Sequence, residues 1–518
     1  MDTKKRELDF FDFELYFGFN NIKFFEARVK KTESLLGKDK LLFSESDKFH
    51  VDYSIEGKEA EELVDEIIHG YIYILEDRTK REWLPDIGWH TARGFRKDQR
   101  KNIRNAVKGI IANLIISFHA FGGTGFVRIP RGNEDYKTSR YNPLITKRNL
   151  IDVLDRLSYG DEYSFMQYYK AVYFENKYKG KVSFNRFTSR YRATGRLYDL
   201  MQDSKIGYRN LIRVSDTIIL KGKTNPTSPY ETYQLYRETD KTTKMRNDLA
   251  KYNALLRKNH NRIRGDMWDK NNEVIQITNH GKMFYHRIFT RNNFESGGRF
   301  YGHWIVQAPS ISRKFIKINA KPTRILDYSA CLMHVAYSTL NIGQYTGKDL
   351  YGMVDEDRAW VKAFCTIAPN TKRLKTACQQ TIKELGLKWN LKNENRVYNL
   401  AHLISESHDE VYKAYFFKGK DLGQRLVYHE SCIANEVIMH FVRKGIIILV
   451  IHDGFCIEKK HRKELFNVMN DKWNQYWKKR GVVSSKPIIK EDKHISEIDN
   501  PIDSIGTFKH MLDSDVSR

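Results

Sequence analysis

The chain has 518 residues, of which 41% are hydrophobic and 13% aromatic, and it has only 10 prolines, so an ordered protein of several packed subdomains is expected rather than a disordered one. The formal net charge of +25 predicts attraction to a polyanion, which makes nucleic acid the expected class of partner. No apolar run approaches the ~20 residues that a membrane-spanning helix needs, and the start MDTKKRELDFFDF lacks the apolar core of a signal peptide, so we expect an intracellular protein, cytoplasmic in a bacterium or phage, with no membrane partner.

The five cysteines lie far apart in the sequence and form no CxxC pair. This spacing is typical neither of a disulfide framework nor of a zinc site.

The N-terminal region, residues 1–180, mixes aromatic-rich stretches with expected helices, of which the clearest runs from Arg96 to His119. Its basic residues Arg100, Arg104 and Lys108 recur every four positions beside an apolar stripe. Two interpretations are open. The helix has either an ordinary solvated basic face or a surface that contacts a template.

Charged segments follow in residues 184–261. Met245, Leu249, Tyr252 and Leu256 recur at helical spacing there, which predicts a long helix. Such a helix could grip a duplex, or it could belong to a packed helical layer without a ligand.

The segment KPTRILDYSACLMHVAYSTL predicts a short strand from Thr323 to Leu326 that ends at Asp327, followed by a helix through Leu340. The segment GIIILVIHDGFCIEKK predicts a strand from Ile446 to Ile451, a tight turn and a returning strand through Ile457, with Asp453 on the turn.

Asp327 and Asp453 meet if their strands are neighbours in one sheet. Two carboxylates in this position hold a pair of divalent ions ~4 Å apart, as nucleotidyl transfer requires. Carboxylate oxygens suit Mg2+, or Mn2+ in its place, better than the softer metals.

A further helix is predicted in DEDRAWVKAFCTIAPN, with Arg358 and Lys362 four positions apart on one face. Taken alone, such a pair is usually a solvated surface. Next to two metal ions, however, it would supply positive charge for a triphosphate, and the lysine could protonate the departing pyrophosphate.

The order of these motifs resembles that of the A-family DNA polymerases and the single-subunit phage-type RNA polymerases. Asp327-Tyr328-Ser329 is similar to motif A, Arg358 with Lys362 to motif B, and His452-Asp453 to motif C. The segment KDLYGMV resembles the family's Asp-x-His/Tyr segment. The resemblance covers roughly residues 280–460.

Upstream, GGRFYGHWIVQAPSISRKF resembles the Gly-Arg motif that precedes motif A, with matches at Gly298, Arg299, Tyr301, Gln307 and Pro309. The chain is also similar to uncharacterised bacterial and mobile-element proteins with a GGRFYGxW segment before this type of palm.

The resemblance implies a role for each matching residue. The catalytic and metal-binding residues are Asp327 and Asp453, and Lys362 also acts in catalysis. The residues expected to bind the nucleotide are Arg358, Lys362, Leu332, Thr366 and Asn370. Those expected to bind template or primer are Arg299, Tyr301, Gln307, His452 and Arg287.

The chain departs from the family pattern at several positions. Gly454 stands where the DNA polymerases have a third acid, and Asn370 stands where motif B has a tyrosine. Leu332 replaces the glutamate that helps those enzymes to exclude a 2′-hydroxyl. Asp12 and Glu14 resemble the start of an exonuclease, but the later acidic motifs are missing, so no proofreading domain is expected.

The expected fold is α+β: a right-hand polymerase with an antiparallel palm sheet, helical fingers and thumb, and a mainly helical N-terminal region. Residues 181–280 would form the thumb-like region, 281–340 the first part of the palm, 341–424 the fingers, and 425–518 the second part of the palm with a C-terminal tail.

The expected function is template-directed polymerisation of nucleoside triphosphates on a template and primer, with DNA synthesis favoured over RNA synthesis or primase activity. Two alternatives remain open: a catalytically inactive nucleic-acid-binding protein with a polymerase-like fold, and a metal-dependent nuclease, in which Arg358 and Lys362 would have no evident task.

Overall fold

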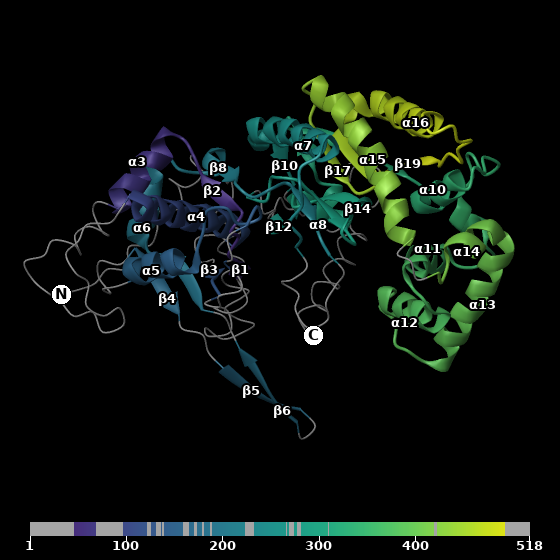
Figure 1. The fold of residues 1–518 in the computed structure, drawn as a ribbon, viewed down its shortest axis with the longest axis horizontal. Helices are drawn as coiled ribbons and strands as arrows, with labels where there is room; N and C mark the ends of the chain where they lie inside the picture. The colour runs from purple at the N-terminus through teal and green to yellow at the C-terminus, as the bar shows by residue number, and fades with distance from the viewer. Residues whose placement is uncertain are drawn as a thin grey trace, which may run out of the picture. The chain divides into compact units, whose positions relative to one another are not determined.

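The computed structural model describes residues 46–68, 97–121, 126–130, 136, 139–158, 165–169, 173–178, 181–186, 189–222, 233–265, 267–268, 274–276, 281–308, 310–418 and 422–492 (Figure 1). The chain divides into two compact units. The first comprises residues 1–216 and 266–283, and the second comprises 217–265 and 284–518. The division falls at residue 217, inside the range expected for the thumb-like region.

The first unit combines helices with short strands. In chain order its elements are β1 (Ser46–Lys48), β2 (Tyr53–Ile55), α3 (Lys58–Ile67), α4 (Lys97–Phe121), β3 (Phe126–Arg128), α5 (Lys147–Leu157), β4 (Met166–Tyr169), β5 (Tyr173–Tyr178), β6 (Lys181–Arg186), β7 (Arg190–Ala193), α6 (Gly195–Asp203), β8 (Leu211–Arg213), β11 (Met267–Trp268) and β12 (Val274–Gln276). Four strands form a sheet in the order β1-β3-β7-β4, in which only the β1–β3 pair is parallel. These strands differ from the mainly helical N-terminal region expected from the sequence.

Helix α4 is the helix predicted from the basic four-residue spacing. Its apolar stripe is buried, and two of its basic side chains form ion pairs with α3. Arg104 contacts both Glu61 and Asp65, and Lys108 also contacts Glu61. These contacts hold α3 against α4, so part of the basic face serves packing within the first unit.

The second unit contains the remaining elements. In chain order they are β9 (Ile218–Leu220), α7 (Asp240–Lys258), β10 (Ile263–Arg264), β13 (His286–Thr290), β14 (Asn293–Tyr301), α8 (Trp304–Gln307), α9 (Ser310–Arg313), β15 (Lys317–Ile318), β16 (Lys321–Tyr328), α10 (Cys331–Thr339), α11 (Arg358–Ile367), α12 (Leu374–Glu384), α13 (Leu391–Ser407), α14 (Asp409–Tyr415), α15 (Leu422–Arg443), β17 (Ile448–Ile451), β18 (Gly454–Glu458), α16 (Arg462–Lys478) and β19 (Ile489–Asp492).

An antiparallel sheet lies at the centre of this unit. Its strands run in the order β10-β15-β16-β18-β17, and β19 pairs with the end of β16. All residues of β17 and β18 are buried, as expected for strands covered on both faces. Helices α15 and α16 contact these strands, and α8 contacts β17. The sheet confirms the expected mixed α and β class with an antiparallel core.

Helix α7 confirms the helix predicted from its apolar spacing. Met245, Leu249, Tyr252 and Leu256 are all buried in the core of the second unit. The Tyr252 hydroxyl donates a hydrogen bond of 2.8 Å to the carbonyl of Ile448 in β17. The apolar face of this helix therefore packs against the central sheet, which matches the packed-layer interpretation of the sequence.

Helices α11, α12, α13 and α14 form a separate helical group within the second unit (Figure 1). Helix α11 is preceded by the N-cap residue Asp357, whose carboxylate accepts a hydrogen bond of 2.7 Å from the Ala359 amide. This cap satisfies one of the free amides of the first turn. It fixes the start of the helix that carries Arg358 and Lys362.

Candidate active site

Asp327 and Asp453 lie on neighbouring strands of the central sheet. Asp327 is the penultimate residue of β16 and is paired directly with Gly454, the first residue of β18. Opposed residues in antiparallel strands have Cα atoms about 5 Å apart, so Asp453, one position earlier, is brought next to Asp327. The turn is tight: Ile451 pairs with Gly454, and His452 has a left-handed backbone with φ of 59°. The structure therefore brings the two predicted acids together.

Both carboxyls have a raised pKa. Burial among neighbouring groups and the charge of Asp453 raise the pKa of Asp327 to about 7. Burial also raises the pKa of Asp453, while the charges of Arg299 and Lys362 oppose this shift. Asp327 remains accessible to solvent on one side. The site is an open pair of acids whose negative charge is only partly balanced by the protein.

Lys362 lies where its charge acts on both acids, since it lowers the pKa of Asp327 and of Asp453. In α11, Trp360, Val361, Ala363, Phe364 and Cys365 are buried, whereas Arg358, Lys362 and Thr366 are exposed. Asn370 continues this exposed line, and its amide donates to the Thr366 carbonyl at 3.2 Å. We call these four residues, Arg358, Lys362, Thr366 and Asn370, the α11 polar stripe.

Arg358 is engaged in an ion-pair cluster. Its Nε donates to Asp349 Oδ2 at 3.0 Å, and its terminal nitrogen donates to Ser329 Oγ at 3.1 Å. Lys490 of β19 binds the same Asp349 oxygen at 2.7 Å. Burial alone would raise the pKa of Asp349, but the hydrogen bonds from these two cations lower it to about 2. Sequence reasoning missed the role of Asp349, although the residue lies in the KDLYGMV segment that it had singled out.

Arg299 binds a buried glutamate. Its Nε donates to Glu430 Oε1 at 2.7 Å and its terminal nitrogen donates to Oε2 at 2.5 Å. Glu430 lies on α15 and is 2% exposed. A bidentate pair of this kind is strong and directional. The charge of Arg299 also lowers the pKa of Asp453. Its guanidinium is thus held beside the acid pair by a partner that the sequence motifs did not reveal.

The aromatic neighbours of the turn are Tyr301 and His452, whose ring centroids lie 5.7 Å apart. Burial and the nearby charge of Arg299 lower the pKa of His452 to about 4. His452 is therefore neutral at physiological pH. Tyr301 is half-buried at the end of β14. Tyr301 thus contacts the residue directly before Asp453, and the binding of template or primer by Tyr301 and His452 stays a prediction.

The geometry of Arg287 does not fit the template contact expected of it. The side chain is 2% exposed, and its Nε donates to the carbonyl of Gly298 at 2.8 Å. A terminal nitrogen donates to Ser431 Oγ at 3.1 Å. The guanidinium also lies against the rings of Phe289 and Phe300. These contacts join β13, β14 and α15, so the Arg287 side chain holds these three elements together.

The remaining predicted residues occupy separate positions. Gln307 is exposed at the last position of α8. Leu332 is half-buried on α10 and packs against the core of the second unit. Pro309, Asp12 and Glu14 lie outside the described residues.

The acid pair fits a hard divalent cation by its chemistry. Both donors are carboxylates; burial raises the pKa of each, and the charge of Asp453 raises that of Asp327 further. A bound cation would relieve this repulsion. Within the residues that the structure describes, no three or more His, Cys, Asp or Glu side chains gather into a metal-binding cluster. Asp327 and Asp453 are the predicted metal ligands that the structure brings together, and the charge of a third carboxylate, Asp492, also raises the pKa of Asp327.

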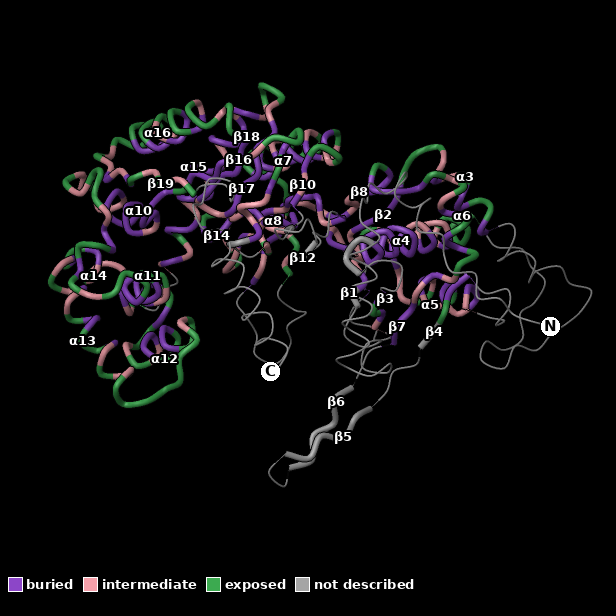
Figure 2. The backbone as a smooth tube through the Cα atoms, turned by 180° about the vertical axis from the view of Figure 1, so that it is seen from behind, coloured by how far each residue is buried: buried purple, intermediate pink, exposed green. Residues whose placement is uncertain are grey.

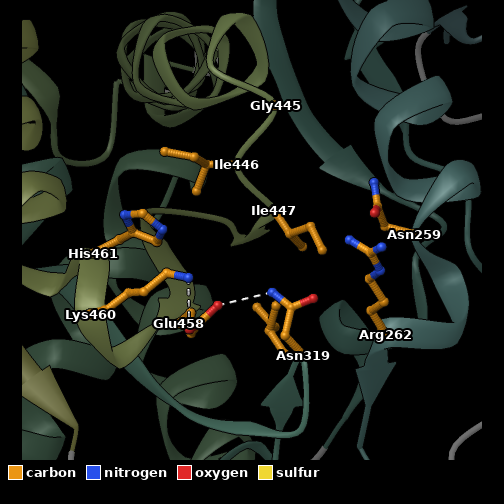
Figure 3. Close-up of a pocket in the computed structure, with 10 residues that line it drawn as sticks. Asn259, Arg262, Asn319, Gly445, Ile446, Ile447, Glu458, Lys460 and His461 are labelled. Carbon is orange, nitrogen blue, oxygen red and sulfur yellow. Dashed lines mark hydrogen bonds and ion pairs between the residues drawn. The ribbon is translucent and has the colours of Figure 1, made fainter.

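A pocket of about 190 Å³ lies at the other end of β18 (Figure 3). Glu458 accepts a hydrogen bond from Asn319 at 2.9 Å and pairs with Lys460 at 3.1 Å, while Arg262 lies across the pocket. None of the predicted site residues lines it. It is a feature distinct from the acid pair.

These features define a site with two carboxylates on an antiparallel sheet, flanked by a helix that carries exposed basic side chains. The sequence matches no protein-family model and has no significant similarity to a curated protein. None of the helices in the described part of the chain is long and apolar enough to cross a membrane.

Proposed function

We propose that the protein is a template-directed nucleic-acid polymerase that transfers nucleotides by a two-metal mechanism. In this proposal the central sheet is the palm of a right-hand arrangement, α11 to α14 are the fingers, and α7 belongs to a thumb-like region. One observation carries the proposal most: Asp327 and Asp453 are held next to each other on paired strands, and Lys362 acts electrostatically on both.

Asp327 and Asp453 would hold two Mg2+ ions, or Mn2+ in their place. When bound, these ions activate the attacking hydroxyl and stabilise the leaving oxygen. Lys362 would place its ammonium group against the triphosphate and supply a proton to the departing pyrophosphate. Arg358 would bind the triphosphate with the rest of the α11 polar stripe. Arg299, fixed by Glu430, would hold positive charge beside Asp453.

The partners in this proposal are a template, a primer and nucleoside triphosphates, and the net charge of +25 favours the polyanion. We favour DNA synthesis. Leu332 is apolar and half-buried, so it offers no group that could accept a hydrogen bond from a ribose hydroxyl. RNA synthesis, including primase activity, is the second candidate. The Gly-Arg-x-Tyr form at Arg299 and Tyr301 favours it.

The decisive experiment is extension of a primed template with Mg2+ and labelled nucleotides, in parallel with an unprimed template and with each nucleotide set. We expect primer-dependent incorporation that favours deoxyribonucleotides. Exclusive use of ribonucleotides would assign an RNA polymerase, and initiation without a primer would assign a primase or transcriptase. Degradation of the primer or template without synthesis would assign a nuclease.

The matched variants are Asp327→Asn and Asp453→Asn, which keep side-chain volume and remove the charge. Both should abolish incorporation while leaving nucleic-acid affinity nearly unchanged, because affinity comes from charge distributed over the surface. Synthesis at the wild-type rate by either variant would disprove the assignment. Normal folding and binding with no synthesis by the wild type would favour the inactive nucleic-acid-binding protein.

A further inference from the structure

The turn between α12 and α13 presents large apolar side chains to solvent. Leu387 is 42% exposed, Trp389 43% and Leu391 72%. Figure 2 shows this turn as an exposed segment at the edge of the α11–α14 group. We call these three residues the α12–α13 tip. Large apolar groups gathered in this way on a surface usually mark a binding site.

The tip is held in one conformation by its backbone. Gly386 has φ of 69°, and its amide donates to the Lys383 carbonyl at 2.9 Å, while the Leu387 amide donates to Ile382 at 3.0 Å. These two bonds end α12 in the manner of a Schellman motif. On the other side, Asn390 caps α13, and the Asn393 side chain donates to the Lys388 carbonyl at 2.9 Å. Trp389 lies between these two fixed ends, so its ring is presented at little cost in conformational entropy.

The indole of Trp389 is available for a ligand. Within the described part of the chain, neither a hydrogen-bond acceptor nor another aromatic ring meets it, and almost half of the residue's surface is open. A buried tryptophan normally has its N–H satisfied by a protein group. An exposed ring with a free face can stack on a nucleobase, whatever that base is.

The surface around the tip is strongly cationic. Residues 372–392 contain six basic side chains and a single acidic one, Glu384. All six basic residues are exposed, and none forms an ion pair with a described residue; they are Lys372, Arg373, Lys375, Lys383, Lys388 and Lys392. Unpaired cations repel one another at modest cost in water, but they attract a polyanion by releasing its counterions. The charge complements phosphate and disfavours a second copy of this basic surface.

The position of the tip relates it to the α11 polar stripe. Asn370 ends the stripe, and Lys372 and Arg373 follow directly before α12. Helix α12 then carries the chain about 16 Å, at 1.5 Å per residue, to the tip. Basic side chains therefore occur along the chain from the α11 polar stripe to Trp389.

We propose that the α12–α13 tip binds single-stranded nucleic acid, with Trp389 stacking on a base and Lys388 and Lys392 contacting the adjoining phosphates. The combination of aromatic platforms with a cationic groove is the general means by which proteins bind single strands without sequence preference. Binding at this tip needs neither metal nor nucleotide, so it goes beyond the proposed polymerase activity and stands or falls separately from it.

The test measures the affinity of the full chain for labelled oligo(dT) and oligo(rU) by fluorescence anisotropy, without metal or nucleotides. Trp389→Ala should weaken binding about 10- to 100-fold, as expected for loss of one stacked base. Trp389→Phe, which keeps an aromatic ring, should retain most of the wild-type affinity. Phe466→Ala removes an aromatic residue with the same 43% exposure on α16 and should have no effect.

The charge component is tested by the salt dependence of the same binding. The double variant Lys388→Gln, Lys392→Gln should reduce the slope of log affinity against log salt by about 1.4, or 0.7 for each phosphate contact on a single strand. Trp389→Ala should leave this slope unchanged, because stacking releases no counterions. This difference separates a stacking residue from a general loss of surface structure.

Three results would overturn the inference. The first is an unchanged affinity in Trp389→Ala. The second is equal weakening by Trp389→Ala and Phe466→Ala. The third is a change of oligomeric state in sedimentation, with the affinity for the oligonucleotide unaltered, which would assign the tip to self-association. If the wild type shows no polymerisation but Trp389→Ala still weakens single-strand binding, the proposed function fails and the binding site remains.

Discussion

Gly454 allows the close approach of its strand to Asp327. A Cβ atom at this position would lie 3.3 Å from the Cβ of Asp327, which is closer than ordinary van der Waals contact. The resemblance to the DNA polymerases places a third acid here. A side chain at residue 454 would require Asp327 to shift by a few tenths of an ångström.

Gly454→Ala therefore provides a steric test of the site. The backbone of Gly454 is not left-handed, so the methyl group adds crowding without backbone strain. We expect Asp327 to be displaced and nucleotide incorporation to fall about 10- to 100-fold, since small misplacements of reacting groups are costly. Steady-state kinetics and oligonucleotide affinity measure the two effects. Gly195→Ala, where a Cβ meets no atom within 4 Å, is the control. Unimpaired turnover in Gly454→Ala would contradict this account.

Asp327 should also reduce stability at neutral pH. Its pKa is about 7 in the folded protein but about 3.9 in an unfolded chain, so the folded state binds more protons between these values. Stability consequently falls as pH rises from about 4 to about 7. Asp327→Asn removes this penalty. We expect its Tm in EDTA to exceed that of the wild type above pH 7, and the difference to shrink towards pH 4. A difference independent of pH would show that the charge is not responsible.

At the scale of elements, α11 illustrates how one helix can serve packing and chemistry together. Its apolar face is buried in the second unit, and its opposite face carries the α11 polar stripe. The stripe offers a matched comparison, because Lys362 and Thr366 are both exposed and lie one turn apart.

Lys362→Ala should lower incorporation about 100-fold or more, while the affinity for template changes little, because the lysine acts on the acid pair and the triphosphate. Thr366→Ala, in the same α11 polar stripe, removes no charge and provides the comparison. Its hydroxyl donates to the Lys362 carbonyl at 2.8 Å, so its loss should be mild. Single-turnover rates and template affinity distinguish the outcomes. Equal losses of affinity in both variants, with unchanged rates, would make α11 a phosphate-contact surface.

The elements that sequence could predict are those with a strong local pattern. Helices α4, α7 and α11 have apolar residues at helical spacing, and the β17–β18 hairpin has continuous apolar runs around His452 and Asp453. The nearness of Asp327 to Asp453 was predicted only on the condition that their strands are neighbours in one sheet, and the pairing of β16 with β18 meets that condition. Strand β19 was missed because Ile489–Asp492 is short and follows no apolar run.

The parts of the site that sequence could not predict depend on partners far apart in the chain. Glu430 lies in the middle of α15 without a motif, yet it fixes Arg299. Lys490 lies 141 positions from Asp349, and nothing local indicates that they meet. For Arg287 the resemblance implied a contact with template or primer, but β13 and β14 enclose its side chain, which is 2% exposed.

At the scale of the whole molecule, the second unit depends on buried neutral histidines. Burial lowers the pKa of His334, His429 and His452 to about 4. His334 shows how this is arranged: its Nε2 donates to the Lys348 carbonyl at 3.1 Å, which leaves Nδ1 to accept from Ser485 Oγ at 2.7 Å. The neutral imidazole of His334 is thus the form that can make both hydrogen bonds.

Acid should therefore destabilise the second unit before most carboxylates protonate. The unfolded histidines take up protons near pH 6.5 and the folded ones near 4, so stability is lost as pH falls through this window, by up to about 1.4 kcal/mol per pH unit for each histidine. His334→Gln can keep both hydrogen bonds and should flatten the dependence of unfolding free energy on pH by about one proton. His402→Gln, at an exposed position, should not. Identical pH dependence in the wild type and His334→Gln would refute the linkage.

The ion-pair cluster at Asp349 has a consequence for which anions the site can admit. Arg358 and Lys490 share this carboxylate, so Asp349 keeps one cation if Arg358 departs. If Arg358 binds the triphosphate as proposed, the incoming anion must replace Asp349 as the partner of Arg358. A triphosphate, with its higher charge, would do so more readily than chloride or a monophosphate. Lys490 would remain paired with Asp349, so the exchange would leave no unpaired carboxylate.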